Sequence, residues 1–413
     1  MKTTDGRAKG GKMGPAEVLR LIRGAGTITR AELIAGTGLG RSTVSQRVEA
    51  LLARQLVRAV GEGPSTGGRP PSTLEFNPNA GLIFAADLGA THSRVALTDL
   101  AGEPLAEQSG EIKIADGPDH VLAWVEERFT QLLETTGHPV DHIRAIGIGV
   151  PGPVEFATGR PVSPPIMPGW DGYAIPDRLR ERYPVPVLVD NDVNIMALGE
   201  HSKVWPRCEH LLFVKVGTGI GSGIVAKGEI YRGAQGAAGD IGHIRLSGHD
   251  DVVCECGNTG CLEAVAGGRA LARELRALGI DAANSRDVVR LVRAHTPDAV
   301  RLVRQAGRQL GEALAGLVNA LNPNVIVIGG DVAEAHEQLF AGVREAVYQR
   351  STPLATRHLQ LVRSSLEDRA GVIGAAVMAI EHILAPDVLD ATLSDSQAGP
   401  PVASLPRKKA GAR

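Results

Sequence analysis

Three of the four cysteines in this chain lie within a stretch of eight residues. Cys254, Cys256 and Cys261 have the spacing Cys-x-Cys-x4-Cys, and His243 precedes them. Three thiolates and one imidazole form a ligand set that zinc binds in tetrahedral geometry. His249 is also close enough in sequence to supply the imidazole. The alternatives are a disulfide with a spare thiol, or three unrelated buried cysteines. The lack of an export signal weighs against the disulfide and the clustering weighs against unrelated cysteines, so zinc is favoured.

Carboxylates flank the cysteine cluster on both sides. Asp240 and His243 come just before it, and Glu263 follows its last cysteine. A metal ion bound by the cysteines would hold these side chains in a fixed geometry. The segment therefore predicts a rigid polar pocket.

A further pair of polar residues follows the apolar stretch Val185–Val189. Asn191 and Asp192 stand where this predicted strand ends. The carboxyl ends of strands are the usual place for chemistry in an open α/β sheet. A local alternative is that Asp192 is the N-cap of a helix over Val193–Gly199, a role that does not exclude a catalytic one.

Three glycine turns, each after an apolar strand, predict a phosphate-binding cleft between two related lobes. Backbone N–H groups in such turns can bind phosphate oxygens, although any single turn is equally well explained as a structural hairpin. None of the turns has the P-loop pattern. The candidate residues for a nucleotide phosphate are Asp87, Gly89, Thr91, Gly217, Thr218, Gly219, Gly329 and Gly330.

Charge is distributed unevenly along the 413 residues. Residues 1–76 contain 12 Lys and Arg against 6 Asp and Glu, whereas the whole chain has a net charge of −2. A basic N-terminal part on an acidic body predicts that only this part meets a polyanion.

The pattern of residues 14–78 is typical of a winged helix-turn-helix domain. A helix over Ala16–Arg23, a capping box from Thr29 to Glu32 and the turn Gly36–Gly40 precede a helix that starts at Arg41. Two short strands would then form a hairpin with a Gly/Pro-rich wing. The last helix would enter the major groove. The predicted DNA-binding residues are Arg41, Ser42, Thr43, Ser45, Gln46, Arg47 and, in the wing, Arg69. A three-helix domain that binds protein is the alternative.

The rest of the chain divides into a body and two polar ends. We expect the lobes of the body to meet near residues 195–200, and a helix over about 370–385 to return to the first lobe. The absence of a long apolar run and of a signal-peptide pattern predicts a cytoplasmic protein. The expected divisions are a flexible arm over 1–13, the helix-turn-helix domain over 14–78, the body over 79–386 and a disordered tail over 387–413.

In type and order, these motifs resemble those of the ROK family (repressors, open reading frames and kinases). The resemblance covers nearly the whole chain. It implies an α/β fold in which a winged helix-turn-helix domain precedes a duplicated actin-like (RNase H-like) sugar-kinase fold with two lobes and a cleft. The segments that carry it are DLGAT from Asp87, VPGPV from Val150, Asn191-Asp192, GTGIGSG from Gly217, YRGAQGAAGDIGH from Tyr231 and CECGNTGCLE from Cys254.

The resemblance also implies roles for single residues. In the kinases of the family, the aspartate that matches Asp192 is the general base that accepts the proton of a sugar hydroxyl. The positions that match the family's sugar-binding residues are Asn191, Asp192, Asp240, His243 and Glu263. Those that match its structural zinc ligands are His243, Cys254, Cys256 and Cys261.

The chain departs from the family pattern at several positions. Asp240 stands where Glu is usual, and His92 ends a turn that reads Gly-Gly-Thr-Lys in kinases. The segment Ser163–Trp170 keeps Pro-Gly-Trp without the usual Asn, and Asp331 follows the glycines of the third turn. These departures weigh against ATP binding more than against sugar binding.

Two functions follow from the resemblance. The first is a sugar-responsive transcriptional regulator, most often a repressor in this family, which binds operator DNA and a sugar or sugar-phosphate effector as a homodimer or homotetramer. The alternative is an ATP-dependent sugar 6-kinase, or a bifunctional protein, with ATP and Mg²⁺ as cofactors beside zinc. The basic helix-turn-helix favours the regulator, because a kinase has no use for it.

Overall fold

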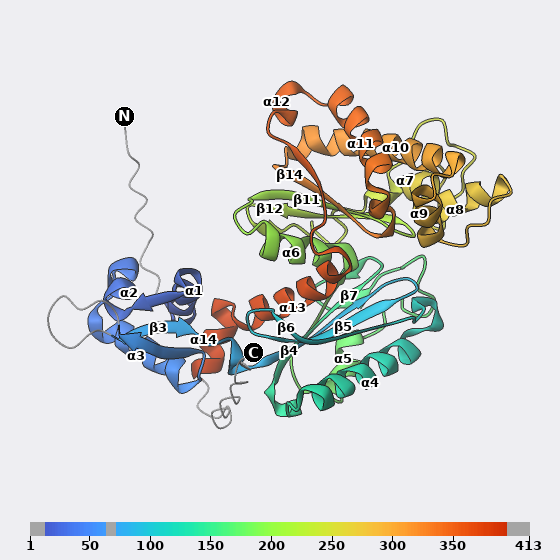
Figure 1. Cartoon of the computed structure of the whole chain (residues 1–413). Helices are drawn as coiled ribbons and strands as arrows, with labels where there is room; N and C mark the ends of the chain where they lie inside the picture. The colour runs from blue at the N-terminus through green and yellow to red at the C-terminus, as the bar shows by residue number, and fades with distance from the viewer. Residues whose placement is uncertain (1–12, 63–71, 395–413) are drawn as a thin grey trace, which may run out of the picture.

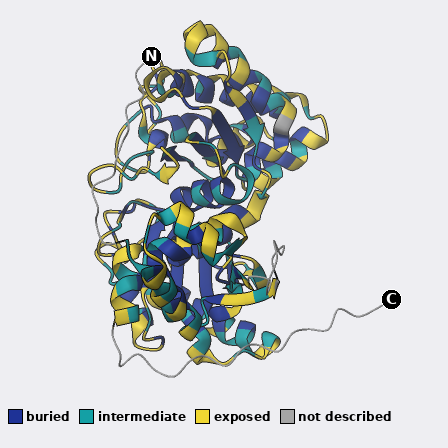
Figure 2. Cartoon of the chain, turned by 90° about the vertical axis from the view of Figure 1, so that its left-hand side faces the viewer, coloured by how far each residue is buried: buried dark blue, intermediate teal, exposed yellow. Residues whose placement is uncertain are grey.

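The computed structural model describes residues 13–62 and 72–394. They form a small head, blue in Figure 1, and a large body of two lobes, each built on one sheet. The α/β class, the winged helix-turn-helix head and the duplicated body agree with the fold predicted from the sequence. The strands of both lobes are largely buried (Figure 2).

The head combines three helices with a three-stranded sheet of order β1-β3-β2. The predicted capping box is present, since the Thr29 hydroxyl accepts from the Glu32 N–H and the Glu32 carboxylate accepts from the Thr29 N–H. Val44, Val48 and Leu51 bury one face of the third helix. The elements are α1 (Pro15–Ala25), β1 (Thr27–Thr29), α2 (Arg30–Thr37), α3 (Arg41–Ala53), β2 (Val57–Glu62) and β3 (Ser72–Phe76).

A helix from the other end of the chain completes the head. The sequence predicts disorder from residue 387, which is wrong for residues 387–394, because they lie in helix α14 (Pro386–Ser394). Leu389 is 4% exposed and belongs to the apolar core of the head. The Asp390 carboxylate accepts a hydrogen bond of 2.9 Å from the N–H of Ala16, so it caps α1. The few apolar residues of this polar segment find their partners only in the folded head, which the sequence pattern does not show.

The first lobe is a five-stranded sheet with the order β10-β7-β4-β5-β6. β4 pairs in parallel with β7 and antiparallel with β5. Helices α4 (Pro118–Thr136) and α5 (Ile175–Arg180) cover its outer face. The strands are β4 (Leu82–Leu88), β5 (Ser93–Asp99), β6 (Pro104–Gly110), β7 (Ile143–Val150) and β10 (Val187–Asn191), with the short pair β8 (Val154–Glu155) and β9 (Arg160–Pro161) beside them.

The second lobe repeats this topology in the order β13-β12-β11-β14-β15. β11 pairs in parallel with β14 and antiparallel with β12. The strands are β11 (His210–Val216), β12 (Ile220–Ala226), β13 (Glu229–Ile230), β14 (Val325–Gly329) and β15 (Gln360–Arg363). The outer helices are α7 (Leu262–Ala266), α8 (Gly268–Ala277), α9 (Ser285–Arg293), α10 (Pro297–Leu321), α11 (His336–Arg350) and α12 (Pro353–Thr356).

Two helices, α6 (Asp192–Val204) and α13 (Ala370–Ile383), lie between the sheets (Figure 1). α13 packs on the first sheet and α6 on the second. They meet through glycine: a Cβ on Gly199 would lie 2.1 Å from the Ala370 carbonyl oxygen, and one on Gly374 would lie 1.7 Å from that of Ile195. A larger residue fits at neither position. Residues 195–200, where the sequence predicts the lobe boundary, lie inside α6.

No single helix of the described residues is long and apolar enough to cross a membrane. The segments Glu367–Ile383 and Pro386–Ser394 meet the length and composition criteria only as a pair bent by 54°. Most of α13 is buried within this fold.

We expect Leu389→Asp to destabilise the head, because the substitution places a carboxylate in an apolar core. The cost should be about 3 kcal/mol. Amide hydrogen exchange read by mass spectrometry should accelerate in α1 and α3 and stay unchanged in the two sheets of the body. Ala391→Asp, at an exposed position of the same helix, is the control. Equal protection of α1 in the two variants would show that α14 does not complete the head.

Candidate functional site

A cavity of about 280 Å³ lies between the two lobes. This volume is near the lower end of the range for small-molecule sites and suits a ligand the size of a monosaccharide. The lining includes every residue that the sequence predicts for sugar or nucleotide binding, namely Asp87, Gly89, Thr91, Asn191, Asp192, Gly217, Thr218, Gly219, Asp240, His243, Glu263, Gly329 and Gly330.

Asn191 and Asp192 reach the cavity where β10 leads into α6. The Asn191 side chain caps α6 by accepting hydrogen bonds from the N–H groups of Val193 and Asn194. The local alternative for Asp192, a role as the cap of this helix, is wrong, because Asp192 is the first residue of the helix. Its side chain is 6% exposed, and its Oδ2 lies 2.6 Å from the Nζ of Lys215.

Asp190, the residue before Asn191, holds the end of β10 in place through hydrogen bonds. Its Oδ1 accepts hydrogen bonds from the Asn191 N–H at 2.7 Å and from the Asn194 amide at 2.9 Å. Its Oδ2 accepts one of 2.7 Å from the Nε of Arg232. The Arg232 guanidinium lies 3.7 Å from the ring centre of Phe156. Because Arg232 belongs to the second lobe and Asp190 and Phe156 to the first, this contact joins the lobes beside the cavity.

Asp87 ends β4 against the start of α13. A Cβ on Gly371 would lie 2.0 Å from the Asp87 Oδ2, so glycine makes room for the carboxyl. The Oδ1 is buried, and no hydrogen-bond partner for it occurs among the described residues. Burial raises the pKa of Asp87 to about 7, although the charge of Lys215 opposes the shift. Asp87 therefore titrates near neutral pH.

The turn Gly217–Gly219, between β11 and β12, contacts two charged side chains. A Cβ on Gly217 would lie 3.7 Å from the Cε of Lys215. One on Gly219 would lie 2.5 Å from the Oε2 of Glu263. Glycine at position 219 thus lets a carboxylate from the start of α7 reach the turn.

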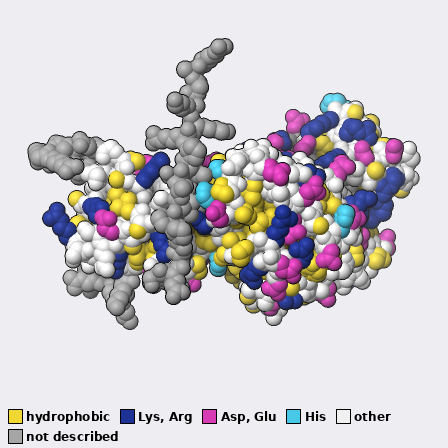
Figure 3. All heavy atoms as spheres, turned by 90° about the horizontal axis from the view of Figure 1, so that it is seen from below, with side chains coloured by type: hydrophobic (Ala, Val, Ile, Leu, Met, Phe, Trp, Pro, Cys, Tyr) yellow, Lys and Arg dark blue, Asp and Glu magenta, His cyan; other side chains and the backbone are white. Residues whose placement is uncertain are grey.

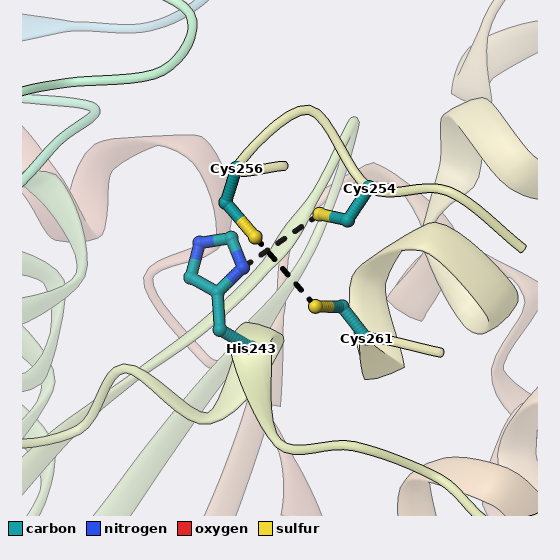
Figure 4. A group of neighbouring side chains, drawn as sticks. All are labelled: His243, Cys254, Cys256 and Cys261. Carbon is teal, nitrogen blue, oxygen red and sulfur yellow. Dashed lines mark hydrogen bonds between the residues drawn. The ribbon is translucent and has the colours of Figure 1, made fainter. Parts of the chain in front are cut away.

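His243 lines the cavity and converges with three cysteines (Figure 4). The four ligand atoms all lie within 4.8 Å of one another. The Sγ atoms of Cys256 and Cys261 are 3.7 Å apart, as are the Cys254 Sγ and the His243 Nδ1. Ligand atoms at about 2.3 Å (sulfur) and about 2.0 Å (nitrogen) from a tetrahedral zinc are about 3.5 to 3.8 Å apart. The cluster therefore fits a zinc ion whose four positions are all filled by protein.

His243 also connects this cluster to the cavity. Its Nδ1 faces Cys254, and its Nε2 lies 3.8 Å from the Oδ1 of Asp240. His249, the other candidate ligand, lies outside the cluster, and its ring contacts Gln309. One histidine ring thus presents different nitrogens to the cysteines and to the cavity.

The three thiols differ in acidity. Burial opposes ionisation of Cys256, but hydrogen bonds from the Asn258 backbone and from the other two thiols outweigh it and lower its pKa to about 7. Burial raises the pKa of Cys254 and Cys261. A metal ion must displace protons from these two thiols, so metal affinity should fall as the pH falls.

The front of α3 carries the predicted DNA-binding residues. Arg41, Ser42 and Gln46 are exposed, and Thr43, Ser45 and Arg47 are half-buried. Basic side chains, with acidic ones among them, lie on the head surface in Figure 3, and acidic and basic side chains are mixed over the body. The wing residue Arg69 lies outside the described residues.

Three polar residues that form the ion pairs described above are not predicted from the sequence. Lys215 lines the cavity, and Asp190 and Arg232 lie beside it. Lys215 gives a signal, because it is a lone charge in the apolar strand β11 shortly before a glycine turn. The other two do not, because acids at strand ends and arginines in loops are common on protein surfaces.

The sequence profile of the ROK family matches residues 83–382. The chain belongs to this family. The xylose repressor of Caldicellulosiruptor bescii is 29% identical over 381 residues, which cover 89% of this chain and 95% of the relative. The crystal structure of a ROK family transcriptional regulator, a homologue of the E. coli MLC protein, has a TM-score of 0.79 at 26% identity and covers 92% of this chain and 98% of that one.

Kinases of the ROK family match a smaller part of the chain. The glucokinase of Halalkalibacterium halodurans is 33% identical over 303 residues, which cover 70% of this chain and 92% of the kinase. The chain therefore has the length and architecture of the family's regulators. The cluster of His243 with the three cysteines is consistent with the zinc-binding motif of the ROK family.

The purified protein should contain about one zinc ion per chain. Cys256→Ser should remove it, because three ligands bind zinc far more weakly than four, and the melting temperature should fall. Atomic emission spectrometry and thermal unfolding measure the two effects. Cys208→Ser, which changes a cysteine outside the cluster, should keep the metal. Zinc loss in both variants, or in neither, would contradict this ligand set.

The Asp87→Asn variant should become more stable than the wild type as the pH rises. The pKa of Asp87 is about 7 in the folded protein against an ordinary value of 3.8. Between these values the unfolded chain has released the proton and the folded chain has not, so raising the pH destabilises the wild type. Asparagine does not titrate. The difference in melting temperature should widen from about pH 4 to about pH 7 and change little above about pH 8.

Asp116→Asn, which changes an exposed carboxylate, is the control for this titration. A difference between Asp87→Asn and the wild type that does not vary with pH would show that the Asp87 carboxyl does not keep its proton in the folded protein.

Proposed function

We propose that this protein is a sugar-responsive transcriptional repressor of carbohydrate genes. The proposal rests on one observation: the exposed front of α3 and the cavity belong to one folded unit. An exposed polar and basic helix front belongs to a head that shares its core with α14, and α14 continues from α13, whose first turn lies beside the cavity. Full-length similarity to the xylose repressor of Caldicellulosiruptor bescii supports it.

In this proposal the head binds operator DNA in the manner of a winged helix-turn-helix. Arg41, Ser42 and Gln46 are exposed at the front of α3, where base edges would be read in the major groove. Positively charged side chains elsewhere on the head would contact phosphates. A homodimer or homotetramer would bind a palindromic operator, and the protein would act in the cytoplasm.

The cavity would bind the sugar through its carboxylates and amide. Asp192, Asp240 and Glu263 offer acceptors for hydroxyl groups, and Asn191 is fixed in place by its role as the helix cap. Bidentate contacts of this kind discriminate among sugars by the position of their hydroxyls.

Zinc would have a structural role in this site. Its four protein ligands would leave no position for a catalytic water. The metal would fix His243, and through it the distance to Asp240, and it would hold the loop that leads into Glu263. Loss of zinc would therefore loosen the sugar contacts before it affects the head.

The sugar would regulate DNA binding through the lobes and α13. To be an effector, it must bind the DNA-free and DNA-bound forms with different affinity. Closure of the lobes around a sugar would move α6 against α13, and α13 continues into the helix that caps the head.

We expect the double variant Arg41→Ala/Gln46→Ala to lose electrophoretic retardation of an operator selected from random duplexes. Each lost base contact should cost about 2 kcal/mol. D-Xylose or D-glucose should change retardation by the wild type. Asp240→Asn should retain DNA binding and lose that response, since it alters only the cavity.

Arg207→Ala, which changes an exposed arginine of the body, is the matched control for the head variant. Unchanged retardation by Arg41→Ala/Gln46→Ala would contradict DNA recognition by α3. An identical sugar response of wild type and Asp240→Asn would contradict the sugar site.

A further inference from the structure

The cavity is rich in acid groups. Its lining contains eight Asp and Glu side chains against three Lys and Arg, namely Lys215, Arg94 and Arg363. Nucleotide phosphates and sugar phosphates are anions, so such a lining favours a neutral ligand unless a cation compensates the carboxylates.

The arginines of the lining already have carboxylate partners. Arg94 bonds to Glu107 at 3.1 Å and also to Asp368. Arg363 bonds to Glu367 at 2.8 Å. Burial lowers the pKa of His92, so this ring of the first turn is neutral at neutral pH. These side chains therefore offer little positive charge to a phosphate.

Lys215 is the cation nearest to Asp192. Its Nζ lies 2.6 Å from the Asp192 Oδ2, and its stem passes Gly217 in the second glycine turn. Burial lowers the pKa of Lys215, but the charges of Asp192, Asp87 and Asp331 outweigh this and raise it, so the ammonium stays charged. The Lys215 ammonium thus contacts Asp192 and is also stabilised by the charges of Asp87 in β4 and Asp331 after β14.

The third glycine turn is followed by a carboxylate that already has a hydrogen-bond partner. Asp331, which follows Gly330, accepts a hydrogen bond of 2.7 Å from the Ser285 hydroxyl at the start of α9. A carboxylate at this position adds negative charge where a phosphate would approach the turn. ATP with Mg²⁺ therefore does not fit the described side chains. Lys215 already compensates the charge of Asp192, and Asp331 places a negative charge at the end of the third glycine turn.

We propose that the Lys215 ammonium takes the place of a divalent cation in this cleft, so that the cleft binds an unphosphorylated sugar without nucleotide or metal ion. Asp192 then accepts a hydrogen bond from a sugar hydroxyl while Lys215 compensates its charge. The inference rests on the proposed sugar-responsive function and specifies its ligand class. It explains how the aspartate of a kinase active site can serve a receptor.

The test uses the full-length, zinc-loaded protein and three probes. Mn²⁺ binding is followed by the loss of the free-ion electron paramagnetic resonance signal. Binding of D-xylose, D-glucose and D-glucose 6-phosphate is followed by calorimetry, with and without ATP and Mg²⁺. The wild type should bind Mn²⁺ with a dissociation constant above about 1 mM. It should bind a free sugar equally well in both conditions and the phosphate ester at least about tenfold more weakly.

Lys215→Met should bind Mn²⁺ about tenfold more tightly than the wild type, because it leaves the carboxylates without a counter-ion. Lys215→Arg keeps the charge and should not. Lys203→Met is the matched control: this lysine is as exposed as Lys215, at 24% against 25%, but pairs with Glu103 away from the cavity.

Tight Mn²⁺ binding by the wild type, Mg²⁺-dependent binding of ATP, or preference for the phosphate ester would each overturn the inference. These arms use the wild type, so they decide the matter even where Lys215→Met does not fold. They are also separate from DNA retardation and its sugar response. A wild type that represses through a sugar phosphate would contradict this inference and leave the proposed function standing.

Discussion

The close contact of α6 with α13 is the constraint on which the rest of this structure depends. The helices belong to different lobes, and they approach so closely that Gly199 and Gly374 meet carbonyl oxygens of the opposite helix. Such packing fixes the distance between the two sheets, because the two backbones are in direct contact and no flexible side chain separates them. The cavity exists where this fixed distance leaves the ends of the central strands facing each other.

The same two helices join the chemistry of the cavity to the head. α6 begins at Asp192, and farther along it the buried Glu200 accepts hydrogen bonds from the Ser364 hydroxyl and the Ser365 N–H, just before α13. α13 starts beside Asp87 and leads to α14, which caps α1 through Asp390. A change in lobe angle therefore reaches the head through packed helices rather than through a flexible linker. Packed helices thus connect the cavity with the head. Allostery requires in addition that the sugar binds one arrangement of the lobes more tightly than another.

Much of the fold and of the site was accessible from the sequence because those parts depend on local patterns. The capping box at Thr29, the glycine turns and the strand that delivers Asn191 are each encoded within about ten residues. Clustering of the cysteines predicted a ligand set whose four ligand atoms the structure brings within 4.8 Å of one another.

The errors have a shared physical cause. The helix at Pro386–Ser394 is stabilised by residues more than 300 positions earlier in the chain: Leu389 packs in the core of the head, and Asp390 accepts a hydrogen bond from Ala16. The cap of α6 is Asn191 rather than Asp192 because the helix begins one residue earlier than the pattern indicates, and boundaries depend on tertiary contacts. Lys215 differs from its neighbours only as a lone charge in an apolar strand, and the sequence does not show the partner that the fold places beside it.

The pair of Lys215 and Asp192 also bears on how kinase and receptor can share one fold. A general base and a hydroxyl acceptor need the same carboxylate in the same place, so a motif that contains Asp192 cannot tell them apart. The difference lies in the charges around it. A kinase must bring a polyanion and its metal ion to the carboxylate, whereas a receptor needs only a neutral sugar and a compensated charge. In this chain one lysine in a central strand supplies that charge, at a position where the sequence otherwise shows only a buried apolar strand.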